Sequence, residues 1–189
     1  MADPVSKDTL KSLVEGKLPW EEVKKLLRMP HKEETRFWNY LEILQEKVPW
    51  KEKILLPLTD HLYIVRKEGK GRIVKCSCGH EFGDYRANWK FGCDVYVRKS
   101  TEEFTEVYTI DPCPIDPNLV EIREYYCPNC STQLAVENVP PGYPPLFDML
   151  PDLDTFYREW LGSPLEDESP EWFQDRTGEL LSQWNAEKK

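Results

Sequence analysis

Two short cysteine pairs constrain the fold of this chain more than any other feature. Cys76 and Cys78 form the first pair, and Cys127 and Cys130 form the second pair, far along the chain. The runs RIVK and EIREYY lead into the two pairs, and both are rich in the β-branched or aromatic residues typical of strands. Zinc needs four soft or nitrogen ligands in a tetrahedron, and two closely spaced pairs at turns can supply them. The spacing therefore predicts a structural zinc site with Cys76, Cys78, Cys127 and Cys130 as ligands.

Disulfide bonding and redox chemistry are the alternatives for these four thiols. A bond between Cys76 and Cys78 would be strained, because residues two apart rarely meet disulfide geometry. Bonds between the two pairs would need an oxidising compartment, and the opening segment MADPVSKDTLKSL contains no apolar stretch typical of a signal peptide. A thioredoxin-like motif should open a helix, whereas a strand-like run follows Cys130. We therefore expect reduced cysteines in a cytoplasmic protein.

Three further residues with ligand chemistry lie outside this set. His80 could replace one thiol, but four thiols already close the tetrahedron, so we expect it beside the ligands or at the surface. Neither Cys93 nor Cys113 has another cysteine two to four residues away. Both are predicted to be free thiols that pack as small apolar groups. Cys113 lies between two prolines, so a rigid turn presenting it to a site is the alternative.

The charge and aromatic content of the chain bear on its partners. The formal net charge is −9, whereas a zinc ribbon that binds nucleic acid should be basic over its binding face. The same charge argues against an anionic membrane surface, and no apolar run approaches the length of a transmembrane helix. With 7 Trp, 9 Tyr and 16 Pro, the chain is suited to proline-rich arms that bury aromatics against another subunit. The alternative is that these aromatics fill its own core.

Hydrophobic periodicity predicts helices towards both ends of the chain and strands in the middle. We expect helices over residues 6–16, 19–29, 35–47 and 152–162, and a last one from Ser169 onward. Strands are expected over residues 62–66, 72–75, 94–98, 103–109, 121–126 and 132–137, with 94–98 paired to 103–109. Residues 138–151, NVPPGYPPLFDMLP, contain too many prolines for a helix or a central strand and are expected to form an extended arm.

These elements predict an α+β fold in three parts. Residues 1–58 are expected to form an N-terminal helical segment. Residues 59–137 are expected to form a small antiparallel, zinc-ribbon-like sheet. Residues 138–189 would supply the proline-rich arm and the C-terminal helices.

Motifs typical of a catalytic site are missing from this sequence. His31, His61 and His80 belong to no metalloprotease or nucleophile motif, and the Gly-Lys-Gly at residues 69–71 is too short for a phosphate loop. Asp152 and Asp154 are expected to cap a helix or to be solvated. A zinc ion closed by four thiolates has no open position for a substrate. We therefore expect a structural or regulatory subunit without catalytic residues of its own.

Three segments resemble the small, or gamma, subunit of the acetone carboxylase family: CSCGHEFGDYRANWK, EIREYYCPNCSTQL and VPPGYPPLFDMLPDLDTFYREWLG. The upstream run LEILQEKVPWKEKILLPLTDHLYIV is similar to that family as well. The FYREWLG motif after the prolines is the most specific of these features, because paired cysteines alone are common. Residues after about position 165 match no pattern of the family.

The resemblance implies a hetero-oligomer in which larger alpha and beta subunits carry out the chemistry. That family carboxylates a ketone with bicarbonate and ATP, converting acetone to acetoacetate. ATP and Mn²⁺ would be bound by the large subunits. Zn²⁺ would be bound by this chain, through Cys76, Cys78, Cys127 and Cys130. Two alternatives stay open: the small subunit of a related carboxylase for another ketone, and a stand-alone zinc-ribbon adaptor.

Overall fold

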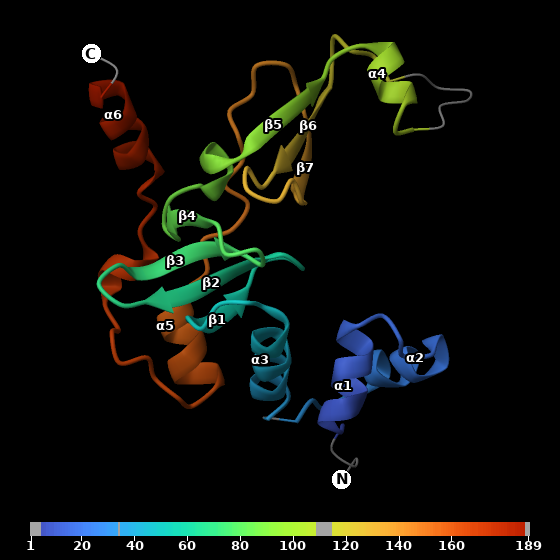
Figure 1. The fold of residues 1–189 in the computed structure, drawn as a ribbon, viewed down its shortest axis with the longest axis vertical. Helices are drawn as coiled ribbons and strands as arrows, with labels where there is room; N and C mark the ends of the chain where they lie inside the picture. Colours follow the sequence, from blue (N-terminus) through green and yellow to red (C-terminus); the bar gives the residue numbers. More distant parts are fainter. Residues whose placement is uncertain (1–4, 34, 109–114, 188–189) are drawn as a thin grey trace.

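The computed structural model describes residues 5–33, 35–108 and 115–187, and Figure 1 shows how its elements are arranged. Helices α1 (Lys7–Val14), α2 (Trp20–Arg28) and α3 (Arg36–Lys47) come first. Two antiparallel sheets follow, and the chain ends in further helical segments. The α+β class is as predicted, although the strands form two sheets. Within the described residues, no helix is both long and apolar enough to cross a bilayer.

Local sequence explains where the N-terminal helices begin and end. The Ser6 hydroxyl accepts a hydrogen bond from the Thr9 amide at 3.1 Å and so caps α1. Gly16, with φ of +69°, supplies the left-handed conformation that often ends a helix. Pro19 precedes the first residue of α2, close to the position where its missing N–H costs nothing. The three helices predicted for this segment are confirmed.

The first sheet consists of β1 (Lys53–Pro57), β2 (Leu62–Lys67), β3 (Gly71–Cys76) and β4 (Glu81–Asp84), in that order. The hairpin of β2 and β3 is the predicted one, whereas β1 and β4 are additions that periodicity did not predict. Apolar clusters cover both faces of this sheet. One contains Tyr63, Val65 and Ile73 and packs against α3, and the other contains Ile64 and Val74.

The second sheet consists of β5 (Asp94–Arg98), β6 (Glu121–Tyr126) and β7 (Gln133–Val139), with β6 in the centre. The predicted strand over residues 103–109 is wrong. Helix α4 (Thr101–Thr105) forms there instead, because Ser100 and Glu103 make a reciprocal capping box at its start. Thr109 lies outside the described residues. Strand β5 therefore pairs with β6, which comes later in the sequence.

Residues 140–152 follow β7 without forming helix or strand, in keeping with their prolines. We call residues 140–151 the proline arm. Asp152 then accepts a hydrogen bond from the Thr155 amide at 3.0 Å and caps α5 (Leu153–Thr155). The helix continues as a π-helical turn, η2 (Phe156–Trp160). The predicted helix over residues 152–162 is thus present, with its second half wound more widely.

The single last helix predicted from Ser169 onward is instead two elements. A 3₁₀ turn, η3 (Pro170–Phe173), comes first, and α6 (Thr177–Glu187) follows. The backbone of Gln174 is extended between them. The Asp175 carboxylate accepts a hydrogen bond from the Thr177 amide at 2.8 Å, which gives α6 a start of its own.

Buried charges tie the proline arm to the second sheet. The 3₁₀ turn η1 (Trp89–Gly92) carries Lys90, whose side chain is only 1% exposed. Its ammonium lies 2.7 Å from a Glu137 oxygen, forms an ion pair with Asp148, and donates to the Leu146 carbonyl at 3.0 Å. The Tyr125 hydroxyl donates to the other oxygen of Glu137 at 2.7 Å. The arm is thus held by its backbone as well as by Asp148.

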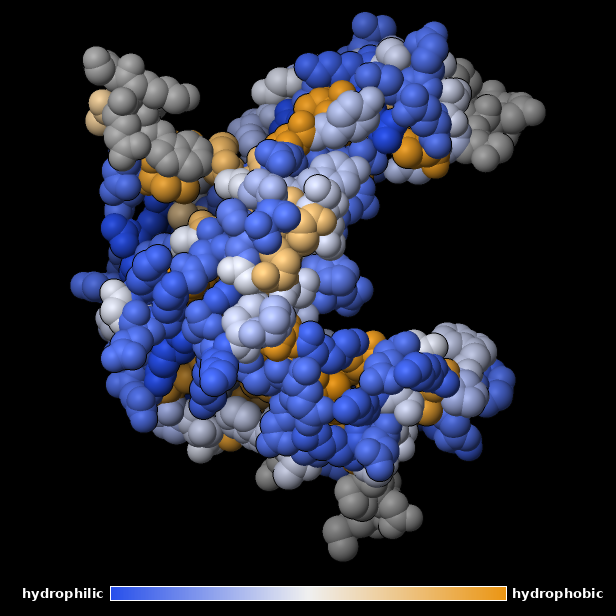
Figure 2. Space-filling model, viewed as in Figure 1, coloured by the Kyte–Doolittle hydropathy of each residue, from blue (hydrophilic) through white to orange (hydrophobic). Residues whose placement is uncertain are grey.

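One side of the molecule is hollowed. In the view that Figures 1 and 2 share, a deep notch separates the second sheet and α4, above, from α1 and α2, below. The first sheet lies between these two projecting parts (Figure 1). The notch matters for partners, because a surface that fits into it would touch both projections.

Candidate metal centre

The first cysteine pair sits on a tight turn at the end of β3. The Cys76 amide donates to the His80 carbonyl, and the Gly79 amide donates to the Cys76 carbonyl, both at 2.8 Å. Gly79 has φ of +102°, a conformation that glycine adopts without steric cost. Gly79 thus lets the backbone curl there. The turn brings the thiol of Cys78 back towards that of Cys76.

The second pair repeats this arrangement after β6. The Cys127 amide donates to the Thr132 carbonyl at 2.9 Å, and the Ser131 amide donates to the Cys127 carbonyl at 2.8 Å. Ser131 has φ of +57° and is alone among the described non-glycine residues in having a positive φ. Such a conformation is uncommon for serine and is held here by the surrounding turn. Each sheet therefore contributes one cysteine turn.

The structure brings the four predicted ligands into one cluster, with all four sulfur atoms within 4.8 Å of one another. Cys76 Sγ lies 3.8 Å from Cys130 Sγ, and Cys78 Sγ lies 3.7 Å from Cys127 Sγ. All four are free cysteines. At a zinc–sulfur distance of about 2.3 Å, a regular tetrahedron has edges of about 3.8 Å. The two short separations fit a tetrahedral metal ion, and both join one sheet to the other.

The buried thiols need a nearby positive charge in order to ionise together. Burial raises the pKa of Cys76 and of Cys127, both of which are fully buried. A hydrogen bond with Thr132 lowers the pKa of Cys130 to about 6. Thiolates that are buried together repel one another and need a compensating positive charge. A divalent cation at the centre of the cluster would supply it.

Neighbouring groups that the sequence did not single out complete the centre. The Asn129 amide donates to Cys78 Sγ at 3.4 Å, and the Thr132 hydroxyl lies 3.2 Å from Cys130 Sγ. The Trp50 indole N–H lies 3.2 Å from the carbonyl oxygens of Cys76 and Ser77, which fixes the first turn against the loop before β1. Asn129 and Thr132 were within reach of sequence reasoning, since they flank Cys130. Trp50 was not, because it comes from a distant segment.

Neither His80 nor Cys93 supplies a ligand atom to the cluster. His80 packs edge-to-face on Phe82, with ring centroids 4.8 Å apart, and contributes no ligand atom to the cluster. Cys93 packs against the core, and burial raises the pKa of its thiol to about 12, as suits an inert thiol. Cys113 lies outside the described residues.

Asp152 and Asp154 were both expected to cap a helix or to be solvated, and only Asp152 does so. Asp152 is the cap of α5. Asp154 is buried and forms an ion pair with Arg72 of β3, whose side chain is fully buried. The expectation for Asp154 is therefore wrong. Its partner lies 82 residues away, so no local pattern could have predicted the pair.

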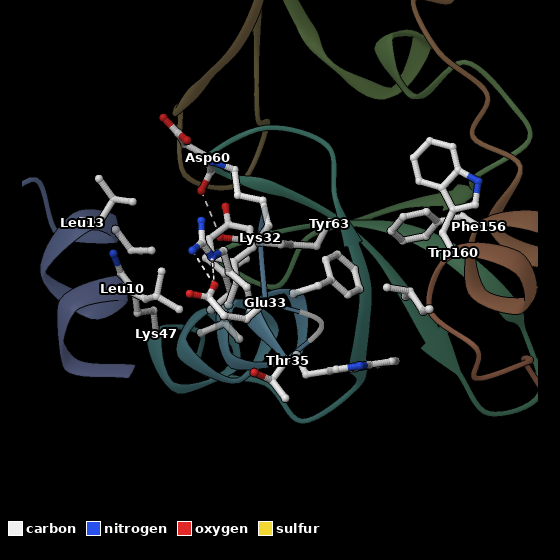
Figure 3. Close-up of a pocket in the computed structure, with 18 of the residues that line it drawn as sticks. Leu10, Leu13, Lys32, Glu33, Thr35, Lys47, Asp60, Tyr63, Phe156 and Trp160 are labelled. Carbon is white, nitrogen blue, oxygen red and sulfur yellow. Dashed lines mark hydrogen bonds and ion pairs between the residues drawn. The ribbon is translucent and has the colours of Figure 1, made fainter. Parts of the chain in front are cut away.

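A long groove begins beside α1 and runs past the first cysteine turn (Figure 3). Leu10 and Leu13 of α1 lie at one end, Tyr63 lies in the middle, and Phe156 and Trp160 lie at the other end. Its volume is about 1640 Å³. Sites for small molecules usually measure roughly 300–1,000 Å³, so this groove suits a segment of polypeptide better.

Comparison with known proteins places the chain in a family. The model of the acetone carboxylase gamma subunit matches residues 48–161, a range that contains both cysteine turns. The chain belongs to the acetone carboxylase gamma subunit family. The acetone carboxylase gamma subunit of Xanthobacter autotrophicus is 44% identical over 154 residues, which cover 81% of this chain and 90% of that protein. The acetophenone carboxylase beta subunit of Aromatoleum aromaticum is 37% identical over 82 residues, 41% of this chain and 61% of that protein.

The family resemblance expected from the sequence is thereby confirmed. The range matched by the gamma subunit model begins after α3 and ends within the FYREWLG motif. It includes both sheets, the proline arm and η2. Helices α1 to α3 and the segment after residue 161 lie outside it.

Proposed function

We propose that this chain is the small auxiliary subunit of a cytoplasmic, ATP-dependent ketone carboxylase, in the first place acetone carboxylase. The observation that carries the proposal is the 44% identity to an acetone carboxylase gamma subunit along 81% of the chain. Acetone, bicarbonate and ATP would be converted to acetoacetate in larger alpha and beta subunits, which would bind ATP and Mn²⁺. The shorter match to an acetophenone carboxylase subunit favours a related ketone as the alternative substrate.

The proposed metal is one zinc ion held by Cys76, Cys78, Cys127 and Cys130. The tetrahedral separations and the soft donor set support zinc. Four thiolates would leave no open position for water or substrate, so the ion would have a structural role. In this chain it would join the end of β3 to the turn after β6, and so fix the second sheet relative to the first.

The proline arm and η2 are the proposed contacts with the large subunits. Tyr143 and Met149 of the arm are 48% and 49% exposed, and Trp160 of η2 is 78% exposed. The arm is tied to the second sheet through Lys90, so it offers these side chains from a fixed backbone. Aromatic anchors that enter a pocket on a partner often carry much of the binding free energy.

Affinity purification from the native host tests this proposal. A tag on this chain should recover two large subunits, with one zinc ion for each small chain. The isolated chain should neither hydrolyse ATP nor carboxylate acetone, because the proposed chemistry lies in its partners. Recovery of a monomer without large partners would support the adaptor alternative and refute the proposal. Turnover by the pure isolated chain, abolished by a point mutation within it, would refute the non-catalytic role.

A further inference from the structure

Helix α2 buries little of its surface against the rest of the chain. None of its nine residues is buried, and Trp20 and Leu27 are 64% and 69% exposed. A helix of this length is marginal in water, because most helical stability in proteins comes from packing an apolar face. The described part of the chain packs α2 only in part, since Val23 and Leu26 are half-buried while Trp20 and Leu27 are exposed. The exposed part of its apolar face is therefore open to a surface of another molecule.

That face is a single stripe. Trp20, Val23 and Leu27 fall at positions i, i+3 and i+7, which lie along one side of a helix. We call these three residues the α2 stripe. Charged residues occupy the rest of the helix except for the half-buried Leu26, and four of them form the ion pairs Glu21–Lys24 and Glu22–Lys25. This is the pattern of a helix that packs into a groove on a partner.

Helix α1 holds the hairpin of α1 and α2 in place. Leu10 is buried, and Lys7 Nζ lies 3.0 Å from carboxylate oxygens of both Glu42 and Glu46 on α3. Lys11 Nζ lies 2.9 Å from Glu46 as well. Figure 1 shows α2 beyond α1, at the end of the lower projection. The anchored helix is α1, and the loop from α1 to α2 is fixed to it, because the amides of Lys17 and Leu18 donate to the Ser12 carbonyl at 2.8 and 3.1 Å.

The charge of the hairpin indicates the chemistry of its partner. Residues 7–28 carry six Lys or Arg against four Asp or Glu, but five of these six cations already form ion pairs within the chain. Arg28, one residue after the end of the stripe, forms no ion pair with any described residue. A complementary surface would be apolar in the middle and acidic at its border.

The groove of Figure 3 begins at α1, the helix that precedes α2. It begins at Leu10 and Leu13 of α1 and ends at Trp160. A partner that covers α2 can also enter the groove at its α1 end, and Trp160 lies at the other end. Together the stripe and the groove offer more contact area than either does alone, as a stable interface needs.

We propose that the α2 stripe docks into an apolar, acid-bordered groove on a large carboxylase subunit, which also fills the groove between α1 and Trp160. This inference rests on the proposed function and names the surface through which assembly occurs. It assigns a role to a helix outside the range matched by the family model.

The test uses the complex co-expressed with a tagged large subunit. Trp20→Ala with Leu27→Ala should raise the dissociation constant of the small chain by about tenfold or more. Arg28→Glu should raise it a few-fold, with a larger effect at low salt. Phe173→Ala is the control, since Phe173 is 56% exposed on η3 and should change nothing. Zinc content and circular dichroism should stay as in the wild type, because no residue of α2 is buried.

Undiminished recovery of a folded, zinc-loaded double variant would overturn the inference. If the wild type itself recovered no large subunit, the proposed function would fail first. Sedimentation with phosphatidylserine vesicles examines a membrane as the partner. Vesicle binding that the double variant loses, with assembly undiminished, would assign the stripe to a membrane and overturn the inference. The isolated chain could instead form a dimer that the double variant does not form. With assembly again undiminished, that result would assign the stripe to a second copy of this chain and overturn the inference.

Discussion

The two sheets of this molecule differ in the balance of forces that hold them. In the first sheet, four consecutive residues of β2 and five of β3 are buried, apolar clusters cover both faces, and Arg72 and Lys75 are the charged residues buried among them. The second sheet buries charged side chains beside its apolar ones: Glu121, Arg123, Glu124 and Glu137. The cysteine cluster joins the two sheets through Cys76 and Cys127.

The sheet that buries more charged side chains should respond more strongly to pH and to metal ions. Hydrophobic burial depends little on pH or on metal ions. Buried ion pairs and thiolates depend on both, and removing one partner of a buried pair is costly. We therefore expect the second sheet to loosen first whenever metal, charge or pH is changed, while the first sheet persists.

The largest effect is expected from Cys127→Ser. It should lose the zinc and several kcal/mol of stability, since structural zinc contributes roughly 10 kcal/mol or more to folding in small zinc domains. Hydrogen exchange should quicken at β6 and β7 far more than at β2 and β3. Cys93→Ser and Cys113→Ser are the controls and should keep one zinc per chain. Loss of zinc in a control, with retention in Cys127→Ser, would refute the ligand assignment.

A smaller effect is expected from Glu137→Gln. It leaves Lys90 buried with a weakened partner, which should cost about 3 kcal/mol. Asp148→Asn is the matched control, because Asp148 pairs with the same ammonium but its side chain is 56% exposed. An exposed partner should contribute about 1 kcal/mol or less. Equal losses in urea unfolding of the two variants would contradict the distinction between buried and exposed partners.

Acid should also destabilise the second sheet before the first. Burial would raise the pKa of Glu137, but hydrogen bonds from Lys90 and Tyr125 outweigh burial and hold that pKa below its ordinary value. The ionised form therefore stabilises the fold above the unfolded pKa of about 4.3, and this stability is lost as pH falls through the folded pKa. Amides of β6 and β7 should lose exchange protection on acidification before those of β2 and β3. Simultaneous loss in both sheets would argue that a single core controls them.

The smallest effect on stability is expected from the triple variant Tyr143→Ala, Phe147→Ala and Trp160→Ala. These side chains lie outside the fully buried clusters, so the free energy of unfolding should change by about 1 kcal/mol or less per residue. Assembly with the large subunits should weaken nonetheless, while zinc content stays at one. Full recovery of large subunits by the folded triple variant would show that the contacts lie elsewhere.

The sequence predicted best what short-range chemistry determines. Cysteine spacing indicated the cluster correctly, because each pair lies on one turn, and prolines indicated the arm. The Ser100–Glu103 capping box was visible in the sequence and could have corrected the strand expected over residues 103–109. The ion pairs of Arg72 with Asp154 and of Lys90 with Glu137 were beyond reach, because tertiary contacts alone bring these residues together.

We propose that four thiolates hold one zinc ion between the two sheets. X-ray absorption at the zinc edge of the purified protein measures the ligands directly. A zinc ion held by the four cysteines should show four sulfur ligands at about 2.3 Å and no nitrogen or oxygen ligand. A nitrogen or oxygen atom in the first shell, or a protein that contains no zinc when folded, would contradict it.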